Sequence, residues 1–151
     1  MKKKNIIKTL GIILALTFAL TACDDVETVS DTAQEVSDYA EYEKWSLQLK
    51  DSFIDEENNS LHINATYTNN SEEPTYAASC FAVRAFQNDK ELTESVYLNG
   101  EDNLATEVRN GQSVDVIYSF ELTDRSEAEV LVGEPTAEQA TIGKKVYNLE
   151  N

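Results

Sequence analysis

Two cysteines and one histidine are the side chains of this sequence best suited to nucleophilic or acid–base chemistry. A thiol activated by a neighbouring imidazole is a common nucleophile, so His62 and Cys80 could form such a pair if their segments met. The sequence specifies no third polar group that would orient the imidazole. We therefore expect Cys80 to be a small apolar residue in a strand, and we predict no catalytic residue and no enzyme activity.

Cys23 stands in a different context, because it follows a basic and then an apolar segment. Four lysines within the first eight residues precede an uncharged apolar run at residues 10–20. A stable membrane span needs about 20 residues, so this run is too short to be one. Its length and its basic flank are typical of a secretory signal peptide. The sequence therefore predicts a signal peptide at residues 1–22.

The order Leu20-Thr21-Ala22-Cys23 resembles the lipobox of bacterial lipoproteins. The resemblance implies cleavage before Cys23 and attachment of a diacylglycerol to its thiol. Because two acyl chains hold a protein stably on a membrane, we expect a protein anchored to the outer face of the cytoplasmic membrane. The alternative is an ordinary secreted protein with a chance cysteine. With Cys23 lipidated, Cys80 would have no partner for an intrachain disulfide.

The charge balance excludes one class of partner. The chain has 12 basic and 28 acidic residues, a net charge of −16. Removal of residues 1–22 takes away four lysines and leaves a mature chain with a net charge of −20. Nucleic-acid binding needs a basic surface, so we predict no nucleic-acid partner. The same charge is repelled by anionic lipid headgroups.

Residues 24–43 contain eight acidic residues and no basic residue, proline or glycine. Small apolar residues recur there every three or four positions, which is a helical spacing. The repulsion between the acids opposes a stable helix. We therefore predict that residues 23–43 are a lipidated cysteine and an acidic tether, partly helical or disordered; a coiled-coil stub is the alternative. The small apolar residues are Val26, Val29, Ala33, Val36 and Ala40.

From residue 44 onward, apolar and polar residues alternate with the period of half-buried strands. The segment at 79–87 is mostly apolar on both faces, which predicts a central strand with Phe81, Val83 and Ala85 toward the core. His62 and Ser119 have the opposite parity from their apolar neighbours, so we expect both on the wetter face. The predicted strands are residues 45–54, 60–70, 79–87, 92–98, 113–122, 129–132 and 145–149.

The turns between these segments complete the fold prediction. Asn-Gly pairs at 99–100 and 110–111 are strong turn signals, and no long helix is indicated. About seven short strands separated by polar turns are typical of an all-β antiparallel sandwich. Residues 44–151 are enough to bury one core. We expect this domain to fold alone, without metal, disulfide or cofactor.

The stretches "LHINATYTNNSEEPTYAASCFAVRAFQNDKELTES" and "VRNGQSVDVIYSFEL" are similar to immunoglobulin-like lipoproteins of Gram-positive bacteria that are grouped as domains of unknown function. The similarity covers residues 44–132. It implies an immunoglobulin-like β-sandwich and an extracellular location, and it supplies no active site. The shared strand and turn residues are Thr68, Asn69, Asn70 and Ser71; Phe86, Gln87 and Leu92; and Gly111, Val114, Phe120 and Leu122.

Loops on such a sandwich are the usual binding elements. The loops at 69–76 and 98–103 are long and polar, and we expect them to meet at one end of the sandwich and bind a protein or glycan partner. Tyr76 follows Pro74 in a long loop, so we expect it to be exposed. The candidate partner-binding residues are Asn69, Asn70, Tyr76, Asn99 and Asp102.

A metal-dependent role is the alternative to a simple binding domain. The acidic turns at 51–57 and 101–103 could hold Ca²⁺ weakly. They lack the spaced Asp/Asn–Gly loop of recognisable calcium sites, so we predict no metal ligands and no cofactor besides the diacylglycerol on Cys23. The predicted function is thus a non-catalytic binding or interaction domain at the cell surface. A weak calcium-binding or enzyme-accessory domain is the alternative.

Overall fold

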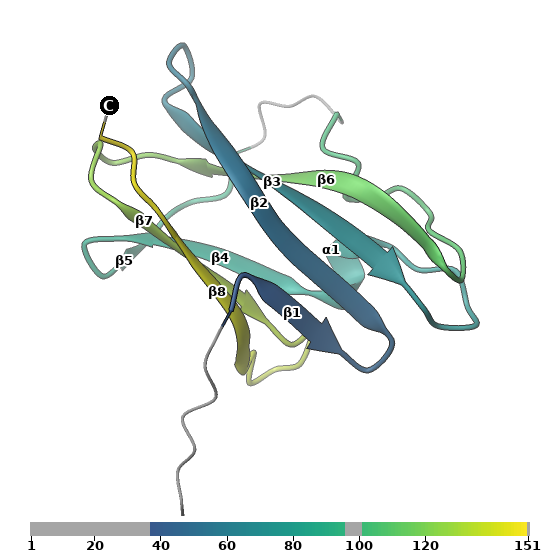
Figure 1. Cartoon of the computed structure of the whole chain (residues 1–151). Helices are drawn as coiled ribbons and strands as arrows, with labels where there is room; N and C mark the ends of the chain where they lie inside the picture. The colour runs from purple at the N-terminus through teal and green to yellow at the C-terminus, as the bar shows by residue number, and fades with distance from the viewer. Residues whose placement is uncertain (1–36, 96–100, 151) are drawn as a thin grey trace, which may run out of the picture. The chain divides into compact units, whose positions relative to one another are not determined.

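The computed structural model of the chain describes residues 37–95 and 101–150 (Figure 1). The predicted signal peptide, the predicted lipidation site Cys23, most of the predicted tether and Asn99 lie outside these residues. Within the two described ranges, no helix has the length and apolar character needed to cross a membrane.

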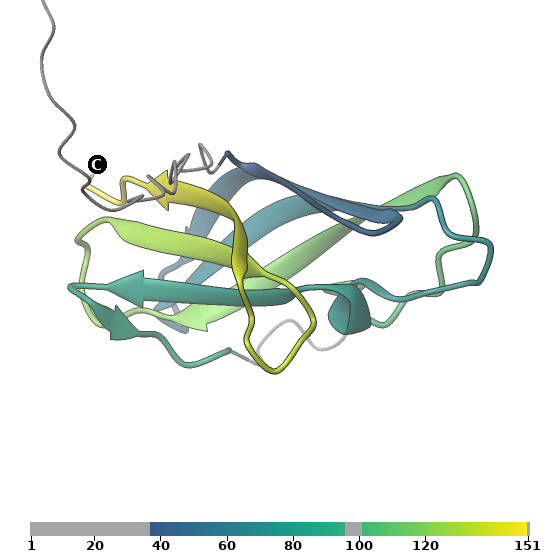
Figure 2. The same ribbon diagram turned by 90° about the horizontal axis from the view of Figure 1, so that it is seen from below.

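Two four-stranded antiparallel sheets make up the fold (Figures 1 and 2). In the first sheet the order is β1-β2-β3-β6, and every neighbouring pair is antiparallel. Long alternating segments form three of its four strands, as the sequence predicts. Its strands are β1 Tyr39–Tyr42, β2 Trp45–Asp55, β3 Ser60–Asn69 and β6 Gln112–Glu121.

The second sheet has the order β5-β4-β7-β8, again antiparallel throughout. A single helical turn, α1 Ala77–Cys80, precedes it. The prediction of an all-β sandwich is therefore confirmed, with eight strands rather than about seven. The strands of the second sheet are β4 Ala82–Gln87, β5 Lys90–Glu91, β7 Ala128–Gly133 and β8 Thr141–Tyr147.

The core lies between the two sheets and is filled by the inward parity of the strands. Leu61 pairs with Phe120 and Ile63 pairs with Tyr118 across β3 and β6, and all four side chains are buried. Burial of one such apolar side chain contributes about 1.5–3 kcal/mol, so these pairs stabilise the first sheet against the second.

The chain enters the second sheet differently from the prediction. The N–H and the hydroxyl of Ser79 both donate to the carbonyl of Tyr76, which closes the turn α1, so β4 begins only at Ala82. Its side chains alternate between half-buried and buried, so only one face of the strand is fully buried. Val83 and Ala85 do face the core, as predicted.

The predicted strand at 92–98 is wrong for the part that the structure describes. Asn88 and Asp89 form a tight turn with positive φ, and β5 continues for only two residues. Leu92 then buries its side chain, and the chain crosses to the first sheet, where the N–H of Ser95 donates to the carbonyl of Ser119 (2.8 Å). Burial of Leu92 thus ends the hairpin early.

The last strand also differs from the prediction, since β8 covers Thr141–Tyr147 instead of 145–149. Gly143 pairs with Val132 and lies against Ala40 of β1; an added Cβ on Gly143 would lie 2.8 Å from the Ala40 Cβ. Glycine therefore permits a close approach that no apolar pattern signals.

Strand β1 lies in the segment that we expected to be tether. Ala40 is completely buried and pairs with Leu47, so the sandwich includes residues 39–42 in addition to those from residue 44 onward. The carbonyl of Ser37 accepts from the Lys144 N–H (2.8 Å), and the carbonyl of Asp38 accepts from the Leu49 N–H (2.8 Å). The start of β1 is therefore bonded to both sheets.

A bulge in β2 joins the sheets a second time. The register of β2 shifts between Leu49 and Ser52, which turns two carbonyls away from the ladder. Lys145 Nζ donates to the carbonyls of Leu49 and Lys50, and the Tyr147 hydroxyl donates to the Lys50 carbonyl (3.1 Å). Side chains of β8 thus satisfy the backbone that the bulge exposes.

Candidate functional site

Asn69, a predicted partner-binding residue, is completely buried. Its Nδ2 donates to the carbonyls of Glu73 and Val108 (2.8 Å each), and its Oδ1 accepts from the N–H and hydroxyl of Ser71. All the polar atoms of its side chain are engaged within the protein. Asn69 therefore shapes the loop at 69–76, and its side chain is not available to a partner.

The other predicted loop residues do not form one surface. Asn70 and Tyr76 are exposed, and the prediction for Tyr76 is confirmed at 41% exposure. Asp102 instead lies along the edge of β6, where its carbonyl accepts from the Ile117 N–H (2.9 Å). The expectation that the two loops meet at one end of the sandwich is thus wrong for Asp102.

Gln87, one of the shared motif residues, is the counterpart of Asn69 in the second sheet. It is buried; its Nε2 donates to the Ser126 carbonyl (3.0 Å), and its Oε1 accepts from the N–H and hydroxyl of Thr123 (3.0 Å each). These bonds hold the connection between β6 and β7. The motif amides are therefore structural.

His62 and Cys80 do not form a catalytic pair. Cys80 is a buried free thiol that accepts from the Tyr67 hydroxyl (3.1 Å) on the inner face of β3. Because His62 and Tyr67 are five positions apart in the same strand, their side chains lie on opposite faces of the sheet. The sheet itself separates the imidazole from the thiol.

His62 is also not on a wet face, which corrects the sequence prediction. Its ring is stacked on Phe53 with centroids 4.7 Å apart, and Nδ1 lies 2.7 Å from the Ser119 hydroxyl. Both His62 and Ser119 are buried. Burial lowers the pKa of His62 below its usual value, with a smaller opposing effect from Asp55.

The acidic turn at 51–57 is closed by its own hydrogen bonds. The Asp55 carboxylate accepts from the Asn58 side chain (2.7 Å) and from the N–H groups of Asn58 and Glu57, and these bonds lower its pKa. Among residues 37–95 and 101–150, no three His, Cys, Asp or Glu side chains converge as metal ligands would.

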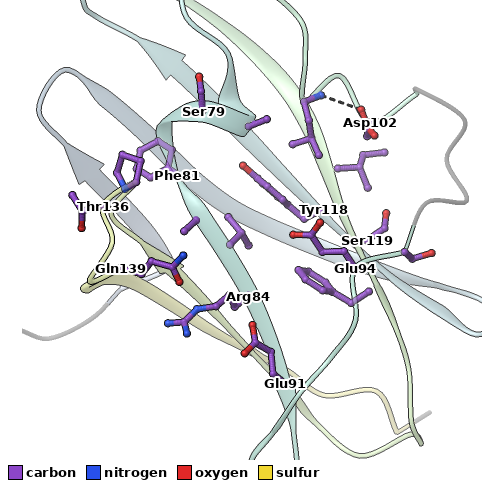
Figure 3. A pocket seen from close by; sticks show the side chains of 18 residues that line it. Ser79, Phe81, Arg84, Glu91, Glu94, Asp102, Tyr118, Ser119, Thr136 and Gln139 are labelled. Carbon is purple, nitrogen blue, oxygen red and sulfur yellow. Dashed lines mark hydrogen bonds between the residues drawn. The ribbon is translucent and has the colours of Figure 1, made fainter.

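The site that sequence reasoning missed is a groove between β4 and β6, with a volume of about 660 Å³. Figure 3 shows side chains from α1, β4, β6 and the β7–β8 loop around it. We call it the edge groove. Polar residues of its lining include Ser79, Arg84, Glu91, Glu94, Asp102, Tyr118, Thr136 and Gln139.

An open strand edge runs along the edge groove. β4 pairs with β7 from Ala82 to Phe86, but β5 reaches only Phe86 and Gln87. The Ala85 carbonyl accepts from the Leu92 N–H (2.8 Å), so Ala85 points its backbone toward the β5 side. Val83 is two residues before Ala85 in β4, so its backbone points to the same side, but β5 does not extend far enough to pair with it. Its N–H and C=O therefore face this edge without a strand partner among the described residues.

Two buried polar atoms of the groove lining also lack hydrogen-bond partners in the described part of the chain: the Tyr118 hydroxyl and the Arg84 Nε. Tyr118 is 8% exposed, and its pKa is raised chiefly by burial, with contributions from Cys80, Tyr67 and Glu94. An unpaired buried polar atom typically costs about 1–3 kcal/mol. A ligand that supplies partners would remove that penalty.

The sequence held one signal for this site. Arg84 is the only charged residue in the apolar segment 79–87, and a charge within such a strand marks a local exception. The open edge itself could not be foreseen, because the predicted strand at 92–98 would have covered it.

Comparisons with known proteins agree with this architecture. The model of a family described as "Domain of unknown function (DUF5067)" matches residues 21–132. A solved "putative lipoprotein" from Staphylococcus aureus aligns with a TM-score of 0.58 at 12% identity, over 74% of this chain and 88% of that one. A "putative lipoprotein" from Bacillus subtilis aligns with a TM-score of 0.56 at 12% identity, over 78% of this chain and 40% of that one. None of the curated proteins compared with the chain matches it. At these identities the structural likeness concerns the fold alone.

Proposed function

Since the chain belongs to the DUF5067 family, whose model matches more than half of it, we propose that it is a lipid-anchored extracellular protein whose β-sandwich binds a partner without catalysing a reaction. The edge groove is the observation that supports the binding role. The N-terminal sequence supports the anchor.

The anchor is proposed to be a diacylglycerol on Cys23, at the outer face of the cytoplasmic membrane. The family match begins at Thr21, two residues before the cysteine at which the mature chain would start. Both structural neighbours reported above are described as a "putative lipoprotein", which supports the same location.

The sandwich is proposed to be immunoglobulin-like. In that fold, strands A, B, E and D form one sheet and strands C, F and G the other. The order β2-β3-β6 corresponds to A-B-E, and β4-β7-β8 corresponds to C-F-G. The N–H of residue 95 donates to the outer edge of β6, and the carbonyls of residues 93 and 102 accept from it, where strand D would lie.

The groove supports binding more than catalysis. The part of its lining that the structure describes contains carboxylates, hydroxyls and Arg84 but no histidine or cysteine. General acid–base catalysis needs a group whose pKa lies near the working pH. The pKa of Tyr118, the buried phenol in the lining, is raised away from that range. An extended ligand could instead form hydrogen bonds with the backbone N–H and C=O of Val83 and with the buried polar atoms of Tyr118 and Arg84.

The anchor is tested by Cys23→Ser, with Cys80→Ser as a matched control. We expect the first variant to stay unprocessed or to be released into the medium, and the second to remain in the membrane fraction. Metabolic labelling with a radioactive fatty acid would report the lipid directly. Normal labelling of Cys23→Ser would refute the lipoprotein assignment.

The binding role is tested by photo-crosslinking in living cells. A photoreactive amino acid at Ala82, which is half-buried in the groove, is compared with one at Thr68, a half-buried residue of β3 outside the groove. We expect a discrete adduct only from position 82. Absence of an adduct at 82, or the same adducts from both positions, would refute binding in the groove.

A further inference from the structure

We propose that the edge groove takes an extended peptide with basic side chains, which adds as a strand to β4 beside Val83. This inference rests on the proposed binding function and names the class of partner.

The backbone of β4 is the first argument. Extended peptides bind open sheet edges through main-chain hydrogen bonds. The N–H and C=O of Val83 present one donor and one acceptor toward the groove. Residues 93, 95 and 102 already bond along the outer edge of β6, and Ser37 before β1 bonds to Lys144 of β8. The first half of β4 is the open strand edge that borders the groove, so we expect the strand to be added there.

The two sides of the groove fit the alternating side chains of a strand. Toward the space between the sheets, the lining is mainly apolar and contains Phe81, Leu104 and Phe120, with the unpartnered Tyr118 hydroxyl among them. Arg84 has the outward parity of β4, and Glu91 of β5 pairs with Phe86 of that same parity. An alternating peptide would place apolar side chains inward and polar side chains outward.

The acidic residues of the groove favour a peptide with basic side chains. Among the described lining residues, Glu91, Glu94 and Asp102 carry negative charge and Arg84 alone carries positive charge. None of the ion pairs between described residues involves Glu91, Glu94 or Asp102. A mature chain of net charge −20 also attracts cationic partners over a longer range. Lysine ammonium groups on the outward side of the peptide can donate to these carboxylates. A second copy of this chain is equally acidic and would supply such cations less well.

The test uses the full-length protein in non-ionic detergent and a fluorescent, end-blocked peptide of sequence Lys-Val-Lys-Val-Lys-Val. We expect saturable binding by fluorescence anisotropy and at least tenfold slower hydrogen exchange of the Val83 amide. Two control peptides separate the causes. Glu-Val-Glu-Val-Glu-Val lacks the charge, and an N-methylated lysine peptide lacks the backbone donors. We expect each to bind at least tenfold more weakly.

Charge-reversal variants then test whether the carboxylates that bind the lysine peptide lie in the groove. Glu91→Lys with Glu94→Lys should weaken binding of the lysine peptide by roughly tenfold or more, as loss of about 1.4 kcal/mol does. Glu72→Lys with Glu73→Lys changes the net charge equally at two exposed residues outside the groove. That control should bind within about twofold of the original protein. Circular dichroism checks that both variants fold.

Several outcomes would overturn the proposal. Equal binding of the N-methylated peptide excludes strand addition, and equal weakening by the two charge variants excludes the groove. Protection of Val83 through dimerisation without peptide would make a second copy the occupant. If no peptide binds while the crosslink at Ala82 persists in cells, the peptide class is wrong and the binding function stands. If no peptide binds and no crosslink forms at Ala82, the binding function itself would be refuted.

Discussion

His62 shows how one side chain can depart from the pattern of its strand. Its parity is outward, yet Phe53 from β2 and Ser119 from β6 lie beside it across the register and bury it. Burial lowers its pKa from the ordinary value of 6.5. The unfolded chain therefore takes up the proton first as the pH falls.

This sign gives a pH prediction. The contribution of neutral His62 to the free energy of unfolding is fully present above pH 6.5 and is lost as the pH falls from 6.5 toward the lower folded pKa. For one proton, the free energy of unfolding changes by at most about 1.4 kcal/mol per pH unit. Urea denaturation at pH 7.5 and 5.5 should show this loss, and His62→Gln should reduce it.

The carboxylates serve as an internal control for that experiment. Hydrogen bonds lower the pKa values of Asp55, Asp115 and Asp124, so their contributions disappear only below about 3.8. They do not titrate in the window of His62. An unchanged slope in His62→Gln would contradict the assignment.

Asn69 and Asn70 are adjacent but have opposite roles. Asn69→Ala removes buried hydrogen bonds to Glu73, Val108 and Ser71, and we expect a loss of about 2 kcal/mol or more. Asn70 is exposed, and Asn70→Ala should change stability by less than about 0.5 kcal/mol. Thermal denaturation of the two variants measures the difference. Similar losses would contradict the structural role of Asn69.

At the level of secondary structure, the contact between Ala40 of β1 and Gly143 of β8 can be tested by deleting β1 and by substituting Gly143. We expect a fragment 44–151 to melt at least about 5 °C below a fragment 37–151, because it lacks the buried Ala40. Gly143→Ala should destabilise the longer fragment by about 1–3 kcal/mol, since its Cβ would meet Ala40. In the shorter fragment most of that penalty should vanish. Scanning calorimetry of the four proteins gives the comparison, and equal penalties would exclude the proposed contact.

The register of β6 is tested by Phe120→Ala. This change should cost about 3–5 kcal/mol, because the side chain is buried opposite Leu61. Ser119, expected from parity to face solvent, is unsuitable as a silent control, since it is buried and bonded to His62. The exposed Ser113 of the same strand is the better control, with an expected change below about 0.5 kcal/mol. Equal effects in chemical denaturation would contradict the register.

The long strands were predictable and the short elements were not. Alternation over about ten residues placed β2, β3 and β6 to within a residue or two of their observed ends. α1, β5 and β8 instead depend on contacts that no local pattern encodes: the turn at Ser79, the burial of Leu92 and the approach of Gly143 to Ala40. The edge groove follows from the early end of β5, so it could not be predicted either.

For the whole molecule, a chelator separates the two functional alternatives. No set of three metal-ligating side chains converges within residues 37–95 and 101–150, and the core between the sheets is closed by apolar residues. We therefore expect the melting temperature to change by less than about 1 °C, within the range of neutral perturbations, when EDTA is added. A fall of several degrees, reversed by Ca²⁺, would favour the calcium-binding alternative.

The bonds of Ser37 and Asp38 have a mechanical consequence. A partner held by an anchored protein would load the chain through the residues that precede β1. Because Ser37 bonds to β8 and Asp38 to β2, with Lys145 3.7 Å from the Asp38 carboxylate, both sheets would carry that force together. Single-molecule pulling from the N-terminus should show a lower rupture force for Lys145→Ala. The predicted tether would then pull on both sheets of the sandwich together, and the first hairpin would not separate before the rest.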